Sequence, residues 1–513
     1  MASRTSGSPA ACSSSLRFRL GRKLPRSAVL APALIVLSLL SPNVAEAGGF
    51  HITILGVKRT SMGTTVAAPD DTTALFHNPA GLADQLGTRV HISNGVTLLG
   101  NEAKLQALDP IRFPEVNAPR CGQPSEPPCR VGIGTDGYYV DNLSPESAIG
   151  VLPYIGASRD LSMLELPQVV FSLAAYAPGA YGATFSDTSP TAYYIIDGLF
   201  VIGAVTAGAG WRLNDVISVG ANVSYNYMRL GYAQKFSTID VLTPAGGMPD
   251  VEAGLAQIAI GDLRIDYVGT DHGFGWCLGA LFTPTDWLSF GASYQGFTAA
   301  TFSGDVELRG VGSVNNGTSP TSPAELRQIV GDLDIKLPTG LEVEMPIPPA
   351  FAIGSNVEVA PWLQLGVDLR LWLYTIFKRQ VRRPTYGDEP GSEAITEESL
   401  SSDKNYSNSY QLNAGFLVAP LEERSSLELM GGVSFDKSPV PDETFSIDNP
   451  SLDQLSFSVG LRSELWKGWR LGASYMYTKY LDRDVTTSQT SPPTNVRITG
   501  ESHIPTLEVE AFF

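Results

Sequence analysis

The stretch from Leu363 to Leu373 reads Leu-Gln-Leu-Gly-Val-Asp-Leu-Arg-Leu-Trp-Leu, with an aliphatic residue at every odd position. Successive side chains of a β-strand point to opposite faces, so one face of this stretch is apolar and the other carries Asp368 and Arg370. A soluble β-sandwich would turn the aliphatic face toward its core, whereas a transmembrane barrel would turn it toward lipid. The rest of the chain must decide between these two folds.

The N-terminal region has the layout of a secretory signal peptide. Basic residues precede an apolar run from Ala28 to Leu40, and Ala45-Glu46-Ala47 forms a small-residue cleavage site before Gly48. The apolar run is too short to cross a bilayer as a helix, and a buried N-terminal helix is the alternative interpretation. We therefore expect an exported protein with a signal peptide at residues 1–47.

The C-terminal segment is a second amphipathic strand. From Thr506 to Phe513 polar and apolar residues alternate, and the sequence ends on an aromatic residue. This resembles the terminal strand of Gram-negative outer-membrane barrels, through which barrel-assembly machinery would act. Outside the signal, no apolar segment of about 18 residues is present, so a spanning chain would have to close into a barrel. The net charge of −17 argues against a nucleic-acid partner.

Alternating segments recur along the rest of the chain without a linker or long helical periodicity. We count 14 candidate strands, and an even number is expected of a bacterial barrel. The prediction is thus an all-β fold, a 14-stranded antiparallel transmembrane β-barrel over residues 88–513. The candidate strands are 88–100, 147–158, 167–186, 198–212, 216–236, 272–284, 287–305, 342–359, 362–380, 407–419, 424–437, 453–465, 468–486 and 503–513. Long extracellular loops are expected at 101–146, 237–271, 306–341 and 381–406.

Two segments do not belong to the predicted wall. Residues 48–87 are too irregular for strands and too apolar for a disordered periplasmic tail, the alternative, so we expect a hatch that plugs the lumen. The first long loop contains Cys121 and Cys129, and in an exported protein a local disulfide between them is expected. No histidine or second cysteine pair lies near them, so we expect neither a metal site nor a cofactor.

Several motifs, taken in order, resemble those of the FadL/TodX-type outer-membrane transporters of long-chain fatty acids and other hydrophobic compounds. The motifs are Gly48-Gly49-Phe50, Asn78-Pro79-Ala80, His272-Gly273-Phe274-Gly275-Trp276, Gly291-Ala292-Ser293-Tyr294, Val343-Glu344-Met345-Pro346 and Phe435-Asp436-Lys437-Ser438-Pro439-Val440-Pro441-Asp442. The chain departs from the family where Ile-Pro-Asp is expected and Asp448-Asn449-Pro450 stands instead. The first loop also departs, since it is rich in proline and has its own cysteines.

The resemblance implies passive uptake of long-chain fatty acids or similar molecules across the outer membrane. Ligand would dock between extracellular loops, enter an inner pocket, and be released when the hatch N-terminus (Gly48, Gly49, Phe50) moves. An inward kink in the third strand would let it leave sideways into the outer leaflet. Burial in lipid gains about 0.8 kcal/mol per CH₂, so no energy source is required. A monomer surrounded by lipopolysaccharide is implied as well.

Particular residues carry these expectations. Asn78, ahead of Pro79 and Ala80, either holds the hatch against the kinked strand through its amide or is a turn residue. Pro178, Gly179 and Gly182 should interrupt regular pairing in the third strand, forming either the lateral gate or a turn between two strands.

Charged residues suggest where a carboxylate would bind. Arg229, at a family position that carries arginine, and Lys235 are the candidates, the alternative being solvated or lipopolysaccharide-facing charges. Asp368 and Arg370 share a face and should line the lumen, where they can pair with each other.

Other functions remain as alternatives. A channel of the same family for aromatic hydrocarbons fits equally, since apolar pocket residues are interchangeable. A barrel-type lipid hydrolase would need a histidine–serine pair, but the chain has five histidines and no Gly-x-Ser-x-Gly motif. A general porin would need an open lumen, against which a hatch and two apolar loop helices (251–263 and 324–333) argue.

Overall fold

The computed structural model describes residues 54–109, 113, 132–146, 148–242, 261–311, 323–332, 334–388, 390–393, 395–420 and 427–513. These residues belong to one unit, Pro42–Phe513. The predicted signal peptide, Gly48, Gly49, Phe50 and the pair Cys121 and Cys129 lie outside the described residues, as does most of the expected helix 251–263.

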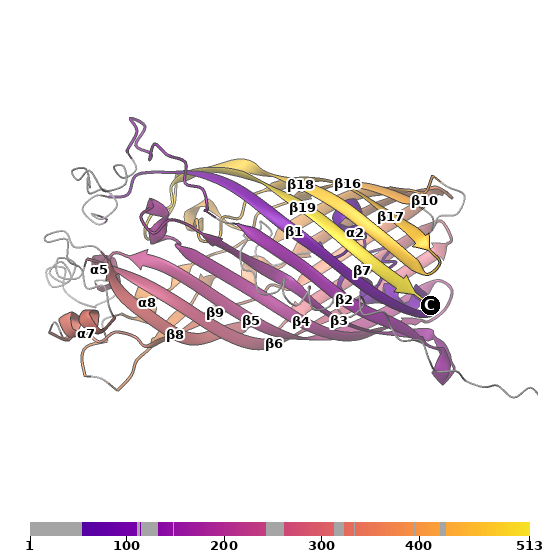
Figure 1. The fold of residues 1–513 in the computed structure, drawn as a ribbon, viewed down its shortest axis with the longest axis horizontal. Coiled ribbons are helices and arrows are strands. Elements are labelled where there is room, and N and C mark those ends of the chain that lie inside the picture. Colours follow the sequence, from indigo (N-terminus) through magenta and orange to yellow (C-terminus); the bar gives the residue numbers. More distant parts are fainter. Residues whose placement is uncertain are drawn as a thin grey trace, which may run out of the picture. The chain divides into compact units, whose positions relative to one another are not determined.

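A closed antiparallel barrel of 14 strands forms the wall (Figure 1), which confirms the predicted fold class. Strand β1 (Thr88–Leu105) closes the ring by pairing with β19 (Val496–Phe512). Three of the barrel strands consist of two segments each, namely β7 with β8, β9 with β10, and β11 with β13. Both β7 and β8 pair with β6, and on their other side β7 pairs with β10 and β8 pairs with β9. Strand β9 then pairs with β13, and β11 pairs with β15. The remaining wall strands are β2 (Ile149–Leu161), β3 (Leu166–Thr184), β4 (Asp197–Arg212), β5 (Ile217–Phe236), β6 (Asp262–Thr285), β7 (Leu288–Phe297), β8 (Ala300–Val311), β9 (Gly340–Met345), β10 (Ala350–Ala360), β11 (Leu363–Trp372), β13 (Arg382–Thr385), β15 (Ser409–Val418), β16 (Glu428–Asp436), β17 (Gln454–Trp466) and β18 (Trp469–Val485).

Helices and short strands lie inside the barrel or in its connections. Among the described residues, none of the helices combines the length and the apolar character needed to cross a membrane. They are α2 (Val57–Met62), α3 (Ala74–His77), η2 (Pro79–Asp84), η3 (Ser162–Leu164), η4 (Pro190–Tyr193), α5 (Thr238–Leu242), α7 (Pro323–Asp332), η6 (Tyr374–Ile376), α8 (Glu397–Leu400) and η7 (Asp442–Thr444), with a small sheet of β12 (Arg379–Gln380) and β14 (Ser402–Asp403).

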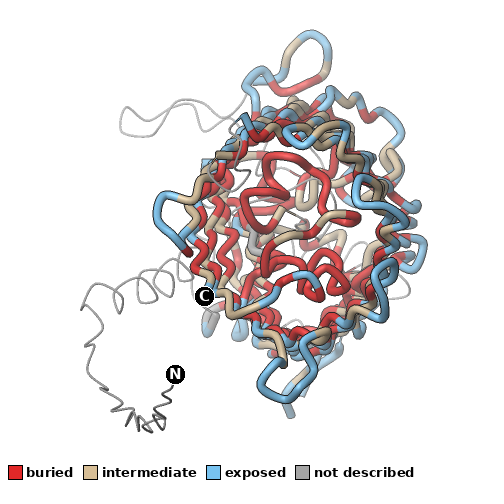
Figure 2. Tube along the Cα trace, turned by 90° about the vertical axis from the view of Figure 1, so that its right-hand side faces the viewer, coloured by how far each residue is buried: buried red, intermediate tan, exposed pale blue. Residues whose placement is uncertain are grey.

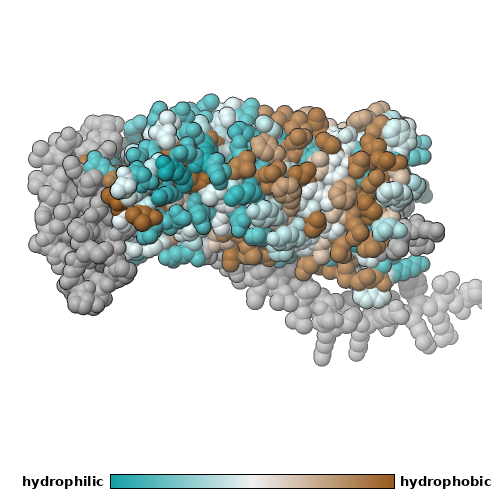
Figure 3. Space-filling view, turned by 90° about the horizontal axis from the view of Figure 1, so that it is seen from above, coloured by the Kyte–Doolittle hydropathy of each residue, from teal (hydrophilic) through white to brown (hydrophobic). Residues whose placement is uncertain are grey.

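Strand β11 resolves the orientation of the amphipathic stretch. Leu365 and Val367 are 44% and 47% exposed on the outer face, whereas Asp368 and Arg370 are 1% and 2% exposed inside. Figure 3 shows the apolar residues gathered around the part of the barrel away from the loop helices. Because lipid surrounds the wall of such a barrel, the aliphatic face of β11 points to lipid, as predicted.

The connections differ in length at the two ends of the barrel. Only two residues separate β10 from β11 and β17 from β18, at the end where Phe513 and Thr88 exchange backbone hydrogen bonds. Short turns are periplasmic and long loops extracellular in outer-membrane barrels. The predicted loop bounds are wrong, because residues 101–105, 262–271, 306–311 and 382–385 continue the strands. Inward apolar side chains such as Leu105 and Ile265 keep packing beyond the lipid-facing belt, which extends the pairing.

The inner segment, which we define as residues 54–87, lies within the ring of strands (Figure 2). Helix α2 packs against β15 to β19, and η2 packs against β3 to β6. A Cβ at Gly220 would stand 2.3 Å from the carbonyl carbon of Pro79, and one at Gly279 would stand 2.1 Å from Oδ1 of Asn78. These two glycines therefore allow the backbone of the segment to lie directly on the wall.

The other end of the lumen contains a large apolar cluster. It joins inward side chains of the wall, such as Phe200, Leu230 and Ile265, to loop residues such as Phe377 and Ile447. Phe200 and Phe302 meet edge to face, with ring centroids 6.0 Å apart. Burial of each such side chain is worth about 1.5–3 kcal/mol. The barrel thus has an inner segment near its periplasmic end and an apolar core near its extracellular end.

Candidate functional site

A cavity of about 110 Å³ opens within the extracellular apolar core. Side chains from the cluster, among them Phe200, Leu230 and Ile447, form one part of its lining. Polar and charged residues form another part: Gln380, Arg382, Lys404, Asp448 and Asn449. A cavity with apolar walls and a few placed polar groups is the usual form of a small-molecule site.

Two cations belong to this lining. Arg382 is 9% exposed, donates from Nη1 to the carbonyl of Leu400 (3.1 Å) and from Nη2 to Oε1 of Gln380 (3.0 Å), and stacks over Tyr232. Its Nε is buried without a hydrogen-bond partner in the described part of the chain. A buried guanidinium with an unused donor is suited to an anionic head group, because charge-assisted hydrogen bonds are the stronger ones.

Lys404 is the second cation and lies 3.9 Å from the carboxylate of Asp448 (Nζ to Oδ2). Burial lowers the pKa of Lys404 below its usual value, an effect that Asp448 opposes. Burial alone would raise the pKa of Asp448, but Lys404, Ser446 and Arg382 together lower it. Asp448 therefore favours the protonated form of Lys404, and Lys404 favours the ionised form of Asp448.

The predicted carboxylate ligands lie elsewhere. Arg229 is exposed on the outer face of β5, on the same face as Tyr225 and Tyr227, so it does not line the cavity. Lys235 donates from Nζ to the backbone carbonyl of Asp187 (2.5 Å). The prediction is corrected for both residues, because inward positions of β5 are the even-numbered ones, such as Leu230 and Tyr232.

Strand β3 is irregular at the predicted position. It runs without a break from Leu166 to Thr184, so the alternative of a turn between two strands is wrong. Its register against β4 shifts between Tyr176 and Gly179, around Pro178, which has no backbone N–H to donate.

Pairing on the other edge of β3 also stops there. Strands β2 and β3 pair from Leu161 opposite Leu166 up to Tyr154 opposite Tyr176. Within residues 148–184, all described, β3 has no β2 partner beyond Tyr176, and a backbone bond from Glu146 to Thr184 (2.8 Å) lies beyond the gap. Gly182 lines the cavity of about 110 Å³, and Pro178 lines another of about 10 Å³. The unpaired part of β3 thus lies next to both cavities.

Asn78 contacts the wall, although at a different strand from the one expected. Its Nδ2 donates to the carbonyls of Val66 (2.7 Å) and Ala280 of β6 (3.1 Å). Its Oδ1 accepts from the backbone N–H of Ala80 (3.2 Å), so it also caps η2. The predicted contact with the kinked strand is corrected to β6, because Pro79 lies over the glycines of β5 and β6.

Asp368 and Arg370 face the lumen as predicted, but within the described part of the chain they form no ion pair or hydrogen bond with each other. Asp368 accepts the backbone N–H groups of Thr65 (2.7 Å) and Val66 (3.0 Å). Arg370 donates to Oε1 of Gln295 (3.3 Å). Asp368 therefore fixes the inner segment rather than its neighbour on β11.

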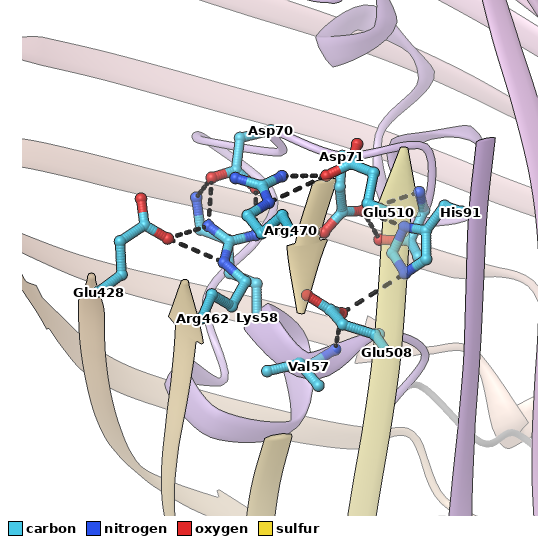
Figure 4. Close-up of polar contacts among 12 residues, drawn as sticks. Val57, Lys58, Asp70, Asp71, His91, Glu428, Arg462, Arg470, Glu508 and Glu510 are labelled. Atoms are coloured by element: carbon cyan, nitrogen blue, oxygen red, sulfur yellow. Dashed lines mark hydrogen bonds and ion pairs between the residues drawn. The ribbon is translucent and has the colours of Figure 1, made fainter. Parts of the chain in front are cut away.

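A buried charge cluster joins the inner segment to the periplasmic end of the wall (Figure 4). Arg462 is 0% exposed and contacts Asp70 of the segment (Nη2 to Oδ2, 2.7 Å) and Glu428 of β16 (Nη2 to Oε2, 2.7 Å). Lys58 pairs with Asp70 at 2.9 Å, and Glu508 accepts the backbone N–H of Val57 at 2.7 Å. The cluster includes Val57, Lys58, Asp70, Asp71, His91, Glu428, Arg462, Arg470, Glu508 and Glu510.

Sequence reasoning missed Arg382, Lys404, Asp448 and the partners in this cluster. Arg382 was assigned to a loop, so strand alternation was not applied there, although Gln380 and Arg382 share a face. Asp448 stands where the chain departs from the family pattern, which is a usable signal. In the described part of the chain, no three histidine, cysteine, aspartate or glutamate side chains gather as a metal site would require.

The fold and the site together define an outer-membrane β-barrel with an apolar cavity, of the class that transports hydrophobic compounds. The sequence profile of the outer membrane protein transport protein family (OMPP1/FadL/TodX) matches residues 38–513. The chain belongs to this family, which confirms the resemblance and the outer-membrane location. Members of the family are transport channels, not enzymes.

Solved structures share the fold at low sequence identity. A Pseudomonas aeruginosa FadL homologue superposes with a TM-score of 0.70 at 16% identity, covering 91% of this chain and 100% of its own. The Ralstonia pickettii toluene transporter TbuX gives a TM-score of 0.60 at 16% identity (91% and 99% covered), and the Pseudomonas putida toluene transporter TodX 0.64 at 12% (91% and 99%). A Neisseria meningitidis outer membrane protein is 22% identical over half of this chain, and the match spans 52% of its length.

Proposed function

We propose that this protein takes up long-chain fatty acids, or molecules of similar chemistry, passively across the outer membrane. The observation that carries the proposal is the pair of buried cations, Arg382 and Lys404, in the lining of an otherwise apolar cavity. A carboxylate would pair with these cations while its alkyl chain lies against Phe200 and Leu230. No enzymatic step belongs to this function.

Aromatic hydrocarbon uptake is the second candidate, and the shared fold with the two toluene transporters favours it. A hydrocarbon would use the apolar walls and leave both cations unused. Asp448 pairs with Lys404, and a carboxylate ligand would supply a second negative charge beside the two buried cations, so we rank a carboxylate ligand first. A lipid hydrolase and a general porin rank lower, because the inner segment is packed against the wall and bonded to it.

The route begins at the extracellular loops and ends in the bilayer. We propose that the inner segment acts as a hatch whose N-terminal end moves, with Gly56 as the hinge. Gly56 has φ of +85°, which side-chain-bearing residues rarely adopt, and it precedes Val57, the first residue bonded to Glu508. Among the described residues, motion before Gly56 would break the contact between His77 Nε2 and the Leu55 carbonyl (2.9 Å) and remove Leu55 from an apolar cluster that includes wall residues such as Leu152.

We propose lateral exit at the unpaired part of β3. The register shift around Pro178, the missing β2 partners beyond Tyr176 and the closeness of Gly182 to the cavity support it. A ligand that leaves there reaches the outer leaflet, where its apolar chain gains most.

The ligand class is tested by binding to purified protein in a non-ionic detergent. The double variant Arg382→Ala/Lys404→Ala is expected to bind hexadecanoic acid about 10- to 100-fold more weakly and toluene equally well, because only the carboxylate uses the cations. Arg309→Ala, an exposed residue paired with Glu307, is the control. Mass spectrometry of extracted ligand completes the test. If no apolar compound is released and the protein conducts ions freely in bilayers, the proposal is wrong.

The lateral exit is tested separately by uptake into cells. Pro178→Ala/Gly179→Ala should lower uptake of hexadecanoic acid at least about tenfold by restoring regular backbone in β3, while binding is unchanged. Gly203→Ala on β4 is the control, since a Cβ there meets no atom within 4 Å. Wild-type uptake by the double variant would sink the lateral exit.

We also propose that the protein is a monomer among lipopolysaccharide and that barrel-assembly machinery inserts it through the strand ending at Phe513. Phe513 is 75% exposed, beside the backbone bonds that join it to Thr88. Removal of Phe513 should reduce the folded barrel in the outer-membrane fraction. An unchanged amount would contradict this role.

A further inference from the structure

An acidic residue lies beside the two cations of the cavity. Asp448 is 3.9 Å from Lys404, and its side chain is 27% exposed. Its Oδ1 is buried and has no hydrogen-bond partner in the part of the chain that the structure describes. Asp448 and Arg382 both line the cavity, and each has one buried side-chain atom without a hydrogen-bond partner among the described residues, Oδ1 of Asp448 and Nε of Arg382.

A simple fatty acid would match only part of this lining. Its carboxylate can accept from Arg382 and Lys404, but it has no donor for Asp448. It would also bring a second negative charge close to Asp448, and like charges at short distance repel. A simple hydrocarbon would use neither the donor nor the acceptor.

A hydroxyl group near the carboxylate would complete the match. The hydroxyl would donate to Oδ1 of Asp448, while the carboxylate accepts from the cations. Because Lys404 and Asp448 are neighbours, the two ligand groups must be separated by few bonds, as in a 2- or 3-hydroxy acid. Sites built around such a hydroxyl discriminate against analogues that lack it, since the buried acceptor is then left unpaired.

The position of Asp448 in the chain supports a specific role. It belongs to Asp448-Asn449-Pro450, the segment in which this sequence departs from the family pattern, and all three residues line the cavity. The departure therefore alters the lining of the cavity rather than a distant loop. The side chain of Asp448 pairs with Lys404, and its backbone belongs to the connection between η7 and β17.

We propose that the cavity selects hydroxylated long-chain acids over simple fatty acids, with Asp448 as the residue that recognises the hydroxyl group. The inference rests on the proposed function and deepens it. Asp448 acts through a hydrogen bond to the ligand, and Arg382 and Lys404 bind the adjacent carboxylate.

The experiment compares hexadecanoic acid with 3-hydroxyhexadecanoic acid. Each competes with a fluorescent fatty acid for the full-length mature barrel, purified in a non-ionic detergent. The wild type should bind the hydroxy acid about tenfold or more tightly than the simple acid. Asp448→Ala should abolish this preference, losing affinity for the hydroxy acid and gaining affinity for the simple one as repulsion disappears. Asp388→Ala, which removes an exposed carboxylate, is the matched control.

The outcomes separate this inference from the function on which it rests. Equal binding of both acids by the wild type, or a preference that persists in Asp448→Ala, overturns the selection of hydroxy acids and leaves fatty acid uptake standing. If neither acid binds, both proposals are overturned. Asp448→Asn provides a second variant, which keeps an acceptor oxygen and removes the charge. It should retain the preference for the hydroxy acid, and loss of that preference would contradict recognition through a hydrogen bond.

Discussion

The inward side chains of strand β19 change from apolar to charged along the length of the strand. Near the extracellular end its inward side chains are Val496 and Ile498, which join the apolar core. Near the periplasmic end they are Glu508 and Glu510, which join the buried charge cluster. The outward side chains along the belt face lipid and are apolar, whereas the inward side chains are apolar at one end and charged at the other. The comparison shows that alternation fixes the direction of a side chain and leaves its chemistry free.

The two regions differ in how they are filled. The periplasmic region contains the inner segment, which is held by ion pairs and by backbone bonds to Asp368 and Glu508. The extracellular region keeps a cavity open among apolar side chains. Directional bonds fix one arrangement, while non-directional apolar contacts can re-form around a ligand.

Arg462→Met should have the largest effect. It removes the cation shared by Asp70 and Glu428 and takes from the buried carboxylate of Glu428 its ion-pair partner, which costs about 3–5 kcal/mol of unfolding free energy. Denaturant unfolding in detergent micelles measures the loss. Arg309→Met, at an exposed pair, should change stability by less than about 0.5 kcal/mol. Equal stability of the two variants would mean that the cluster does not fasten the segment.

Gly220→Ala should displace the inner segment without removing a charge. The added Cβ would lie 2.3 Å from the Pro79 carbonyl carbon, so the segment must shift, at a cost of about 1–3 kcal/mol. Protease cleavage within residues 54–87 and ion conductance in bilayers should both increase. Gly203→Ala, where the new Cβ meets nothing, serves as the control. An unchanged conductance would show that the segment does not close the lumen.

Leu230→Trp should act on the extracellular region alone. Leu230 lines the cavity, and the larger ring would occupy space that the ligand's chain needs. Uptake of hexadecanoic acid is expected to fall roughly tenfold through overpacking of the site. The susceptibility of the inner segment to protease should remain that of the wild type. A change in that susceptibility would mean that the two regions are coupled.

The smallest predicted effect is a dependence of binding on pH. Burial lowers the pKa of Lys404, so the residue loses its proton at a lower pH than an ordinary lysine. A carboxylate binds the protonated form, and its affinity should therefore be full below this pKa and fall as pH rises through it, by roughly tenfold. Lys404→Arg should remove the dependence, because arginine stays charged. A wild-type affinity that is flat with pH would exclude Lys404 from head-group binding.

Local patterns were sufficient for much of this fold. The strands, the lipid-facing side of Leu363 to Leu373 and the irregularity at Pro178 follow from side-chain alternation and from the missing N–H of proline, which are properties of neighbouring residues. Loop bounds were less predictable, since strands such as β6 continue past the lipid belt into the apolar core.

Head-group residues could not be found in the same way. Arg229 has the right charge on a regular strand, but its odd position turns it outward, while Arg382 and Lys404 come together from β13 and a loop. Alternation gives no information about how loops fold over a barrel. The difference from the family pattern at Asp448 was the feature of the local sequence that pointed to the cavity.

The sequence by itself determined that the chain crosses the outer membrane as a barrel and which face of each regular strand meets lipid. Each of these depends on interactions between near neighbours or with a uniform solvent. Only the tertiary structure decided which inward groups meet, such as Arg462 with Asp70, 392 positions apart, and Lys404 with Asp448. The height of a side chain within the lumen and the path of the inner segment set these pairs, and both depend on closure of the whole ring.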